Sequence, residues 1–248
     1  MSNTAISLVV FAFAFGGALL GFFLRTVLPQ HHLSADSKDI VRLGMAFVVT
    51  TTALVLSLLV ASAKSHFDAQ ATELTAMSAK VVLLDRVLAG YGPEAKEVRA
   101  QLRADVLQML NQIWSEGGTA PAPSAQGIAA LFDKVQELSP RSDTQRSLQA
   151  HALNIALALG ETRWLMYEQS AAQVSKPLLV VVAFWLTIIF ISFGLFAPKN
   201  STVVASLFFS ALAVSGAIFL ILEMYTPFAG WIRVSSAPLR AALAHLGQ

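Results

Sequence analysis

The chain has 248 residues, of which 55% are hydrophobic and 13% are charged, and its mean hydropathy is +0.62. These values lie outside the range of soluble globular domains and predict a membrane protein. Seventeen Lys and Arg against fifteen Asp and Glu leave a formal net charge of +2, so neither a nucleic-acid groove nor a polybasic tail is expected. The sequence has no cysteine, which excludes disulfides, thiolate metal sites and cysteine nucleophiles.

Four segments are long and apolar enough to cross a membrane, since a spanning helix needs about 20 residues with few charges. Asp, Glu, Lys and Arg are absent from residues 2–24, 43–63, 177–198 and 200–222. The predicted spans are 5–25, 43–63, 178–197 and 202–222. No Lys or Arg precedes the first span, which is longer than a usual signal core, so we expect it to remain in the mature protein.

The even number of spans places both termini and the segment 64–176 on the same side of the membrane. Near the span ends, that side carries Lys64, Lys80, Arg163, Lys176, Arg233 and Arg240. The other side carries Arg25, Lys38, Arg42 and Lys199. The excess of six over four favours cytoplasmic termini. The chain therefore divides into spans 1 and 2 (1–63), a soluble helical domain (64–176), spans 3 and 4 (177–224) and an amphipathic tail (225–248).

The segment 64–176 contains eleven basic and twelve acidic residues, which is typical of a solvated helical surface. No proline occurs between Val41 and Ala89, so the second span is predicted to continue out of the bilayer as one helix of roughly 70 Å. Further helices are expected at 93–114, 125–138 and 140–175, with Ser139 as the N-cap of the last. Residues 115–124, rich in Gly and Pro, are expected to form a loop.

No residue qualifies as a catalytic candidate. Apart from Arg25, the last residue of the first, the predicted spans hold no ionisable side chain, which argues against proton-coupled transport. The soluble segment has no P-loop, dinucleotide-binding or metalloprotease motif, so neither a cofactor nor a metal is expected and the chain is not predicted to be an enzyme. A buried cluster around a pocket, formed by Asp85, Arg86, Glu94 and Arg99, would revive an enzymatic function.

The second span carries an unusual density of hydroxyl groups. Phe47, Thr50, Leu54, Ser57 and Ala61 recur at spacings of three or four, so they share one helix face. Around a symmetry axis, this face would line a weakly polar path with apolar constrictions at Phe47 and Leu54 and hydroxyl rings at Thr50 and Ser57. Alternatively, the hydroxyls bond back to carbonyls of their own helix or to a neighbouring span.

Two other features predict packing. Gly17 and Gly21 form a GxxxG pattern in the first span, which allows close approach of another helix. After the fourth span, a short helix capped by Ser235 and Ser236 presents Leu239, Leu243 and Leu246 on one side. That helix is expected to lie on the membrane surface or to dock on a neighbouring subunit.

Two separated segments carry a resemblance to a known family. The first is Leu84-Asp85-Arg86-Val87-Leu88-Ala89-Gly90-Tyr91-Gly92-Pro93-Glu94-Ala95, followed by Arg99, Leu102 and Arg103. The second is Tyr225-Thr226-Pro227-Phe228-Ala229-Gly230 with Val234-Ser235-Ser236-Ala237-Pro238-Leu239-Arg240. Both are similar to segments of uncharacterised bacterial membrane proteins described as having a bestrophin-like domain. This resemblance covers essentially the whole chain.

The resemblance implies an all-α membrane protein of the bacterial inner membrane. Bestrophins are pentameric anion channels with four spans per subunit and a pore lined by the second span. The resemblance therefore implies a homo-oligomer that conducts small ions passively, with a preference for anions. Its expected partners are further copies of the chain, membrane lipids and small ions, and no nucleic acid. Calcium binding is not implied, because Glu223 is the only acidic residue after the fourth span. The alternative is a non-conducting membrane scaffold or signalling partner whose soluble domain binds another protein.

Overall fold

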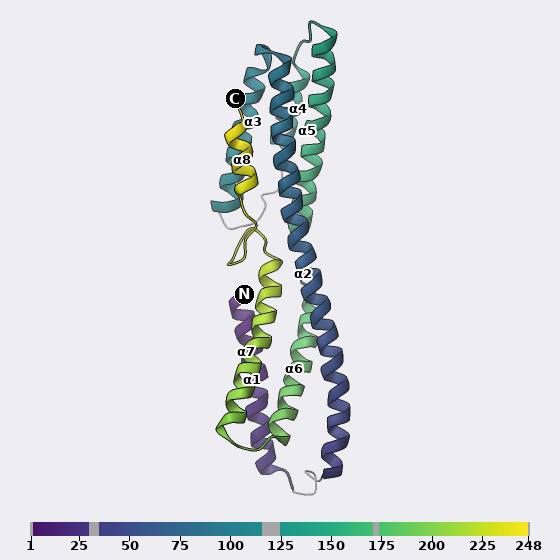
Figure 1. Cartoon of the computed structure of the whole chain (residues 1–248), viewed down its shortest axis with the longest axis vertical. Helices are drawn as coiled ribbons and strands as arrows, with labels where there is room; N and C mark the ends of the chain where they lie inside the picture. The colour runs from purple at the N-terminus through teal and green to yellow at the C-terminus, as the bar shows by residue number, and fades with distance from the viewer. Residues whose placement is uncertain (1, 30–34, 116–124, 171–173, 248) are drawn as a thin grey trace. The chain divides into compact units, whose positions relative to one another are not determined.

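The computed structural model describes residues 2–29, 35–115, 125–170 and 174–247, and these residues form helices without any strand. The helices are α1 (Asn3–Val27), α2 (Ala35–Tyr91), η2 (Pro93–Ala95), α3 (Lys96–Ser115), α4 (Ala125–Gln136), α5 (Asp143–Ser170), α6 (Lys176–Phe196), α7 (Ser201–Met224) and α8 (Ala237–His245) (Figure 1). Helices α1, α2, α6 and α7 are long and apolar enough to cross a membrane. The predicted all-α class with four spans is confirmed.

The described chain forms two compact units. The first contains residues 1–64 and 173–224, and the second contains residues 65–172 and 225–248. In the first unit, α1 packs along both α6 and α7 (Figure 1). A cluster centred on Ala14, Ala18 and Phe22 of α1 buries side chains of α6 and α7, including Phe190 and Leu207.

The contact between α1 and α6 depends on glycine. A Cβ atom added to Gly17 would lie 3.0 Å from the carbonyl oxygen of Thr187, and one added to Gly21 would lie 2.8 Å from the backbone nitrogen of Leu195. The reciprocal position on α6 is Gly194, where a Cβ would lie 3.1 Å from the backbone nitrogen of Phe22. The two backbones therefore meet where neither helix carries a side chain.

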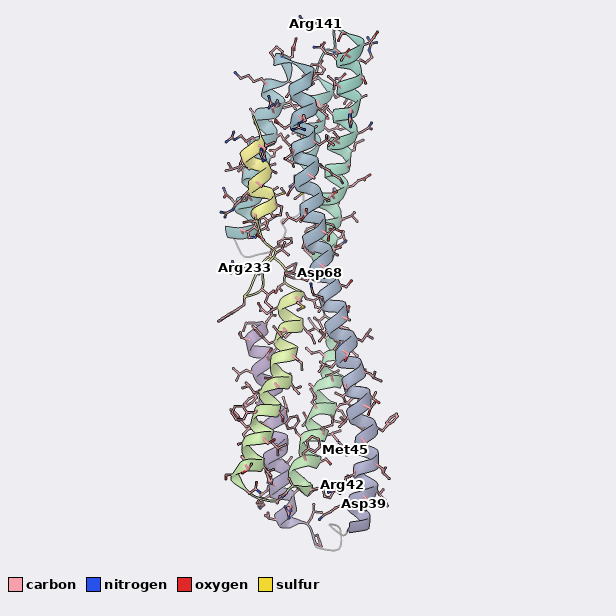
Figure 2. The ribbon with its side chains drawn as sticks, viewed as in Figure 1. Asp39, Arg42, Met45, Asp68, Arg141 and Arg233 are labelled. Carbon is pink, nitrogen blue, oxygen red and sulfur yellow. The ribbon has the colours of Figure 1, made fainter. Side chains whose placement is uncertain are left out.

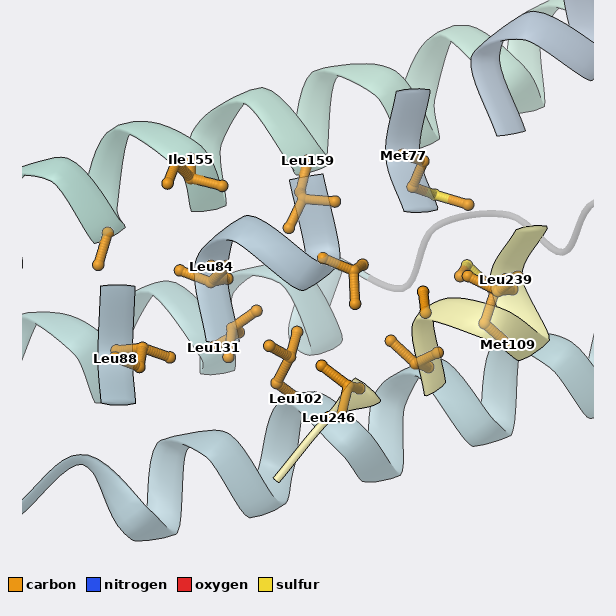
Figure 3. Close-up of a cluster of buried hydrophobic side chains, with 14 of the residues drawn as sticks. Met77, Leu84, Leu88, Leu102, Met109, Leu131, Ile155, Leu159, Leu239 and Leu246 are labelled. Atoms are coloured by element: carbon orange, nitrogen blue, oxygen red, sulfur yellow. The ribbon is translucent and has the colours of Figure 1, made fainter. Parts of the chain in front are cut away.

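The second unit is a helical bundle with one apolar core. The core draws buried side chains from five helices (Figure 3). Those labelled in the figure are Met77, Leu84 and Leu88 of α2, Leu102 and Met109 of α3, Leu131 of α4, Ile155 and Leu159 of α5, Leu239 of α8, and Leu246 directly after α8. Spacings of three, four and seven along α2 place its contribution on one face.

The prediction for the C-terminal tail was wrong. Leu239 of α8 and Leu246, which directly follows it, are buried in the core of the second unit of the same chain, so the chain itself covers the apolar side of the tail. The indole of Trp114 on α3 donates a hydrogen bond to the carbonyl of Val234 just before this helix, over 3.1 Å. The tail is therefore part of the helical bundle of the second unit.

The predicted start of α5 also needs correction. The helix begins at Asp143 rather than Pro140, and the hydroxyl of Ser142, not of Ser139, accepts a hydrogen bond from the first-turn backbone nitrogen of Gln145. The side-chain amide of Gln149 donates to three carbonyls at the end of α4, which fixes the connection between the helices. The loop predicted at 115–124 lies outside the described residues except for Ser115, the last residue of α3.

Candidate functional site

The face of α2 that was predicted to line a path is exposed within the chain. Phe47 is 75% exposed and Leu54 is 67% exposed, and the side chains of Thr50 and Ser57 are exposed as well. None of the four is covered by α1, α6 or α7 of the same chain. These side chains are therefore available to another molecule, whether lipid, water or a second copy of the protein.

The opposite face of α2 is the covered one. Thr52, Leu59 and Ala63 are 3%, 5% and 0% exposed, and their spacing of seven and four residues places them in one row. At 100° per residue, this row lies roughly half a turn away from the row of Phe47 and Leu54. The chain thus buries one side of the apolar part of α2 and leaves the other side open.

The hydroxyl groups of this helix bond back to its own backbone. Thr50 donates to the carbonyl of Ala46 over 2.8 Å, and Ser57 donates to the carbonyl of Ala53 over 2.8 Å. Thr51 and Thr52 make the same bond to the carbonyl four residues earlier. This is the alternative that the sequence left open. Each hydroxyl proton is used within the helix, so the exposed oxygen of Thr50 or Ser57 offers lone pairs rather than a donor.

Charged side chains lie before the apolar part of α2. Asp39 and Arg42 form an exposed ion pair near the start of the helix, with 3.6 Å between the carboxylate oxygen and the guanidinium nitrogen (Figure 2). Because both side chains are largely exposed, this pair contributes little to stability. If copies of the chain were to surround a path, these charges would lie close to one of its ends.

A buried carboxylate that the sequence did not predict lies at the other end of the membrane unit. Helix α7 extends to Met224, beyond the predicted end at 222, and so includes Glu223, which is 3% exposed. Its carboxylate accepts a hydrogen bond from the side-chain amide of Asn3 at the start of α1, over 3.0 Å. Nothing in the local sequence signals this contact, because the two residues lie 220 positions apart.

The charged residues that would have revived an enzymatic function are only partly brought together. Asp85 of α2 and Arg99 of α3 form a two-pronged ion pair, with 2.7 and 2.8 Å between their atoms, and this pair raises the pKa of the Arg99 guanidinium. Arg86 and Glu94 are exposed and take no part in it. The backbone nitrogen of Gly247 donates to the same Asp85 carboxylate over 3.2 Å, so the pair fastens the tail to the bundle.

Among the described residues, no group of three or more His, Asp or Glu side chains could hold a metal ion. The described part of the chain therefore offers two candidate regions. One is the exposed face of α2 in the membrane unit. The other is the interior of the helical bundle in the second unit.

The family model described as "Bestrophin-like domain" matches residues 12–239. Among solved structures, a bacterial bestrophin homologue from Klebsiella pneumoniae, crystallised with a tryptophan-to-alanine mutation, superposes with a TM-score of 0.72. The alignment covers 99% of this chain and 97% of that one at 12% identity, so it shows a shared fold. No curated protein matches the sequence.

Proposed function

Because the chain belongs to the bestrophin-like family, whose members are ion channels, we propose that it is a homo-oligomeric channel that conducts small ions passively. In this proposal α2 lines the path, with apolar constrictions at Phe47 and Leu54 and hydroxyl rings at Thr50 and Ser57. The protein resides in the bacterial inner membrane with cytoplasmic termini, and the family pattern favours five copies and a preference for anions.

The observation that carries the proposal is the exposure of Phe47 and Leu54 on the side of α2 that the chain leaves open. In an assembly around an axis, residues seven apart on this face would form rings about 10 Å apart along the path. Two rings of large apolar side chains would exclude water when closed, whereas the hydroxyls between and below them would support a hydrated path when open.

The orientation of the hydroxyls bears on ion preference. While Thr50 and Ser57 donate to their own helix, their oxygens face outward as acceptors, which suits a cation better than an anion. An anion would need these protons, so each hydroxyl would have to rotate away from its carbonyl as the ion passes. Such rotations are fast and cost little more than one hydrogen bond each, about 1 kcal/mol.

One observation favours a second candidate function. Because every hydroxyl of Thr50, Thr51, Thr52 and Ser57 is satisfied within α2, this helix can also face lipid without leaving a donor unpaired. A membrane scaffold with no path, which binds a protein partner through its soluble bundle, is consistent with that arrangement.

Ion flux from liposomes distinguishes the two functions. The full-length protein should release trapped chloride or potassium without a partner gradient, and Leu54→Ser should increase this leak severalfold by wetting a constriction. Leu212→Ser on α7 is the matched control, because Leu212 is also an exposed leucine of the membrane unit but lies outside α2. Flux no greater than that of empty vesicles, for both the wild type and Leu54→Ser, would reject conduction in favour of the scaffold.

A further inference from the structure

The interior of the helical bundle in the second unit leaves little room for a ligand. Its cavity between α2, α3, α4 and α5 has about 40 Å³ of space for water, which is enough for one or two molecules. A larger space lies at the surface of the same unit, where an open cleft has about 470 Å³ of room for water. This cleft is lined by the end of α2, by η2, by the first half of α3 and by the end of the tail.

Three basic side chains line the cleft from one face of α3. Lys96, Arg99 and Arg103 are spaced by three and four residues, so at 100° per residue they fall within a sector of about 60°. The remaining lining residues are small and uncharged: Ala89, Gly92, Pro93, Ala100 and Gly247. The space over this face of α3 is therefore bordered by positive charge and by walls that leave room for a ligand.

The fold holds two of these cations in position. Arg99 makes the two-pronged ion pair with Asp85, a residue that is 5% exposed. Arg103 donates from Nη1 to the carbonyl of Leu246 over 3.2 Å, which leaves the rest of its guanidinium fork available to a ligand. Because these contacts already order the two side chains, a ligand that binds them costs little further side-chain entropy.

Positive charge exceeds negative charge in the lining of the cleft. Lys96 is exposed, and neither Lys96 nor Arg103 forms an ion pair with a carboxylate of the described residues. Of the nearby carboxylates, Asp85 is already paired. Glu94 lies beside the cleft, since a Cβ atom at Gly92 would be 2.8 Å from its Oε2, but it does not line the cleft. Two cations of the lining therefore have no counter-charge in it, and the cleft attracts anions.

We propose that this cleft binds a small soluble anion of the class of diphosphates. The ligand would lie over α3 between Lys96 and Arg103, which are seven residues or about 10 Å apart along the helix axis. The long side chain of Lys96 and the planar fork of Arg103 can then each bind one phosphate group. A diphosphate fits because its oxygens accept charge-assisted hydrogen bonds from both cations at once, whereas a monovalent ion such as chloride serves only one of them. The inference does not rest on conduction.

Titration calorimetry on the full-length protein in detergent, at about 0.15 M NaCl, tests the proposal with inorganic pyrophosphate as the probe. Pyrophosphate should bind at submillimolar concentration. Orthophosphate should bind about tenfold more weakly, because it cannot reach both cations. No binding of pyrophosphate at millimolar concentration, or orthophosphate binding as tightly as pyrophosphate, would overturn the proposal.

The same titration in lipid nanodiscs distinguishes a soluble ligand from a phosphate headgroup of the membrane. The affinity for pyrophosphate should agree within about threefold between nanodiscs of phosphatidylcholine and nanodiscs that also contain phosphatidylglycerol, because salt screens the lipid charge. Loss of pyrophosphate binding in the anionic nanodiscs alone would assign the cleft to a lipid headgroup and overturn the proposal of a soluble ligand.

Two variants locate the site. Lys96→Gln and Arg103→Gln should each weaken pyrophosphate binding about fivefold, since each removes one partly solvated charge. Arg146→Gln is the control, because Arg146 is an exposed cation of the same unit that pairs with Asp143 and does not line the cleft. Lys96→Gln breaks no contact between described residues, so it decides the question even if Arg103→Gln fails to fold. Unchanged affinity in Lys96→Gln, or an equal loss in Arg146→Gln, would overturn the assignment.

Discussion

Substitution of Gly21 by alanine is expected to weaken the packing of α1 on α6. A Cβ atom at this position would lie 2.8 Å from the backbone nitrogen of Leu195 and 3.0 Å from the carbonyl carbon of Gly194. Real Cβ atoms do not approach so closely, and both neighbours are backbone atoms that cannot rotate away. The two helices must therefore separate or slide. Gly16, on the same helix, is the matched control, because a Cβ there meets nothing within 4 Å.

The substitutions at Gly21 and Gly16 should change the free energy of unfolding in opposite directions. Overpacking a tight contact costs about 1–3 kcal/mol, whereas replacing glycine by alanine inside a helix gains about 0.5–1 kcal/mol. At Gly21 both effects act, and the free energy of unfolding should fall by about 1 kcal/mol. At Gly16 only the helix effect acts, so the free energy of unfolding should stay the same or rise. Gly194→Ala, which removes the space from the other side of the contact, should resemble Gly21→Ala.

Thermal unfolding of the purified protein in detergent measures these differences. A change of 1 kcal/mol corresponds to a shift in Tm of about 2–4 °C for a chain of this length. We expect a lower Tm for Gly21→Ala and an unchanged or higher Tm for Gly16→Ala. Equal shifts for the two variants would refute the reasoning, because helix propensity alone would then account for both.

Two predictions concern the second unit. Asp85→Asn should destabilise it by roughly 3 kcal/mol, because Arg99 keeps a charge that is only 21% exposed, and because Arg99 and Gly247 must share the one acceptor oxygen that the amide retains. Faster tryptic cleavage at Arg240 would show release of the tail, and unchanged cleavage would contradict the prediction. Asp105→Asn should be at least as stable as the wild type at neutral pH. Because burial raises the folded-state pKa of Asp105, its charge destabilises the fold above that pKa. The difference in Tm between the variant and the wild type should therefore vanish as the pH falls toward 3.8. A variant less stable than the wild type at neutral pH would contradict this prediction.

The membrane spans could be predicted from sequence because the cost of a charge in hydrocarbon is large and local. The predicted first span, 5–25, falls within α1 (Asn3–Val27), and the fourth, 202–222, falls within α7 (Ser201–Met224). Helix α7 continues two residues beyond the predicted span, to Met224, for a specific reason. Glu223 reads as the first residue outside the membrane, yet Asn3 allows it to stay buried. A charged residue is taken as the end of a predicted span unless the residue that pairs with it is known. Asn3 lies 220 positions from Glu223, so no local sequence pattern indicates their contact.

The amphipathic pattern of the tail could not predict which part of the structure covers its apolar side. Leu239, Leu243 and Leu246 on one side of a short helix fit a membrane surface, another subunit or the chain's own core equally well. The choice is made by polar contacts from α3, since Trp114 donates to Val234 and the guanidinium of Arg103 donates to the carbonyl of Leu246 over 3.2 Å. Periodicity specifies which face is buried, but not what covers it.

The two segments that carry the family resemblance meet inside the second unit. Leu84 and Leu102 of the first share one core with Phe228 and Leu239 of the second, and the ion pair of Asp85 and Arg99 holds the end of the tail. In this chain, the two segments therefore serve to pack the bundle and to fasten the tail to it.

The family match over residues 12–239 includes the predicted path residues but does not specify an ion. Among Phe47, Thr50, Leu54 and Ser57 on the open face of α2, the polar side-chain atoms are the hydroxyl oxygens of Thr50 and Ser57, whose protons are donated to carbonyls of the same helix. Selectivity in the proposed channel then depends on whether the interaction of an ion with these hydroxyls offsets the cost of rotating them away from their carbonyl partners. A cation can use them as they stand, while an anion must break two hydrogen bonds in each copy of the chain. A measured anion preference would therefore require those protons to turn toward the path or the field to come from charges beyond the bilayer, such as Arg42 near the start of α2.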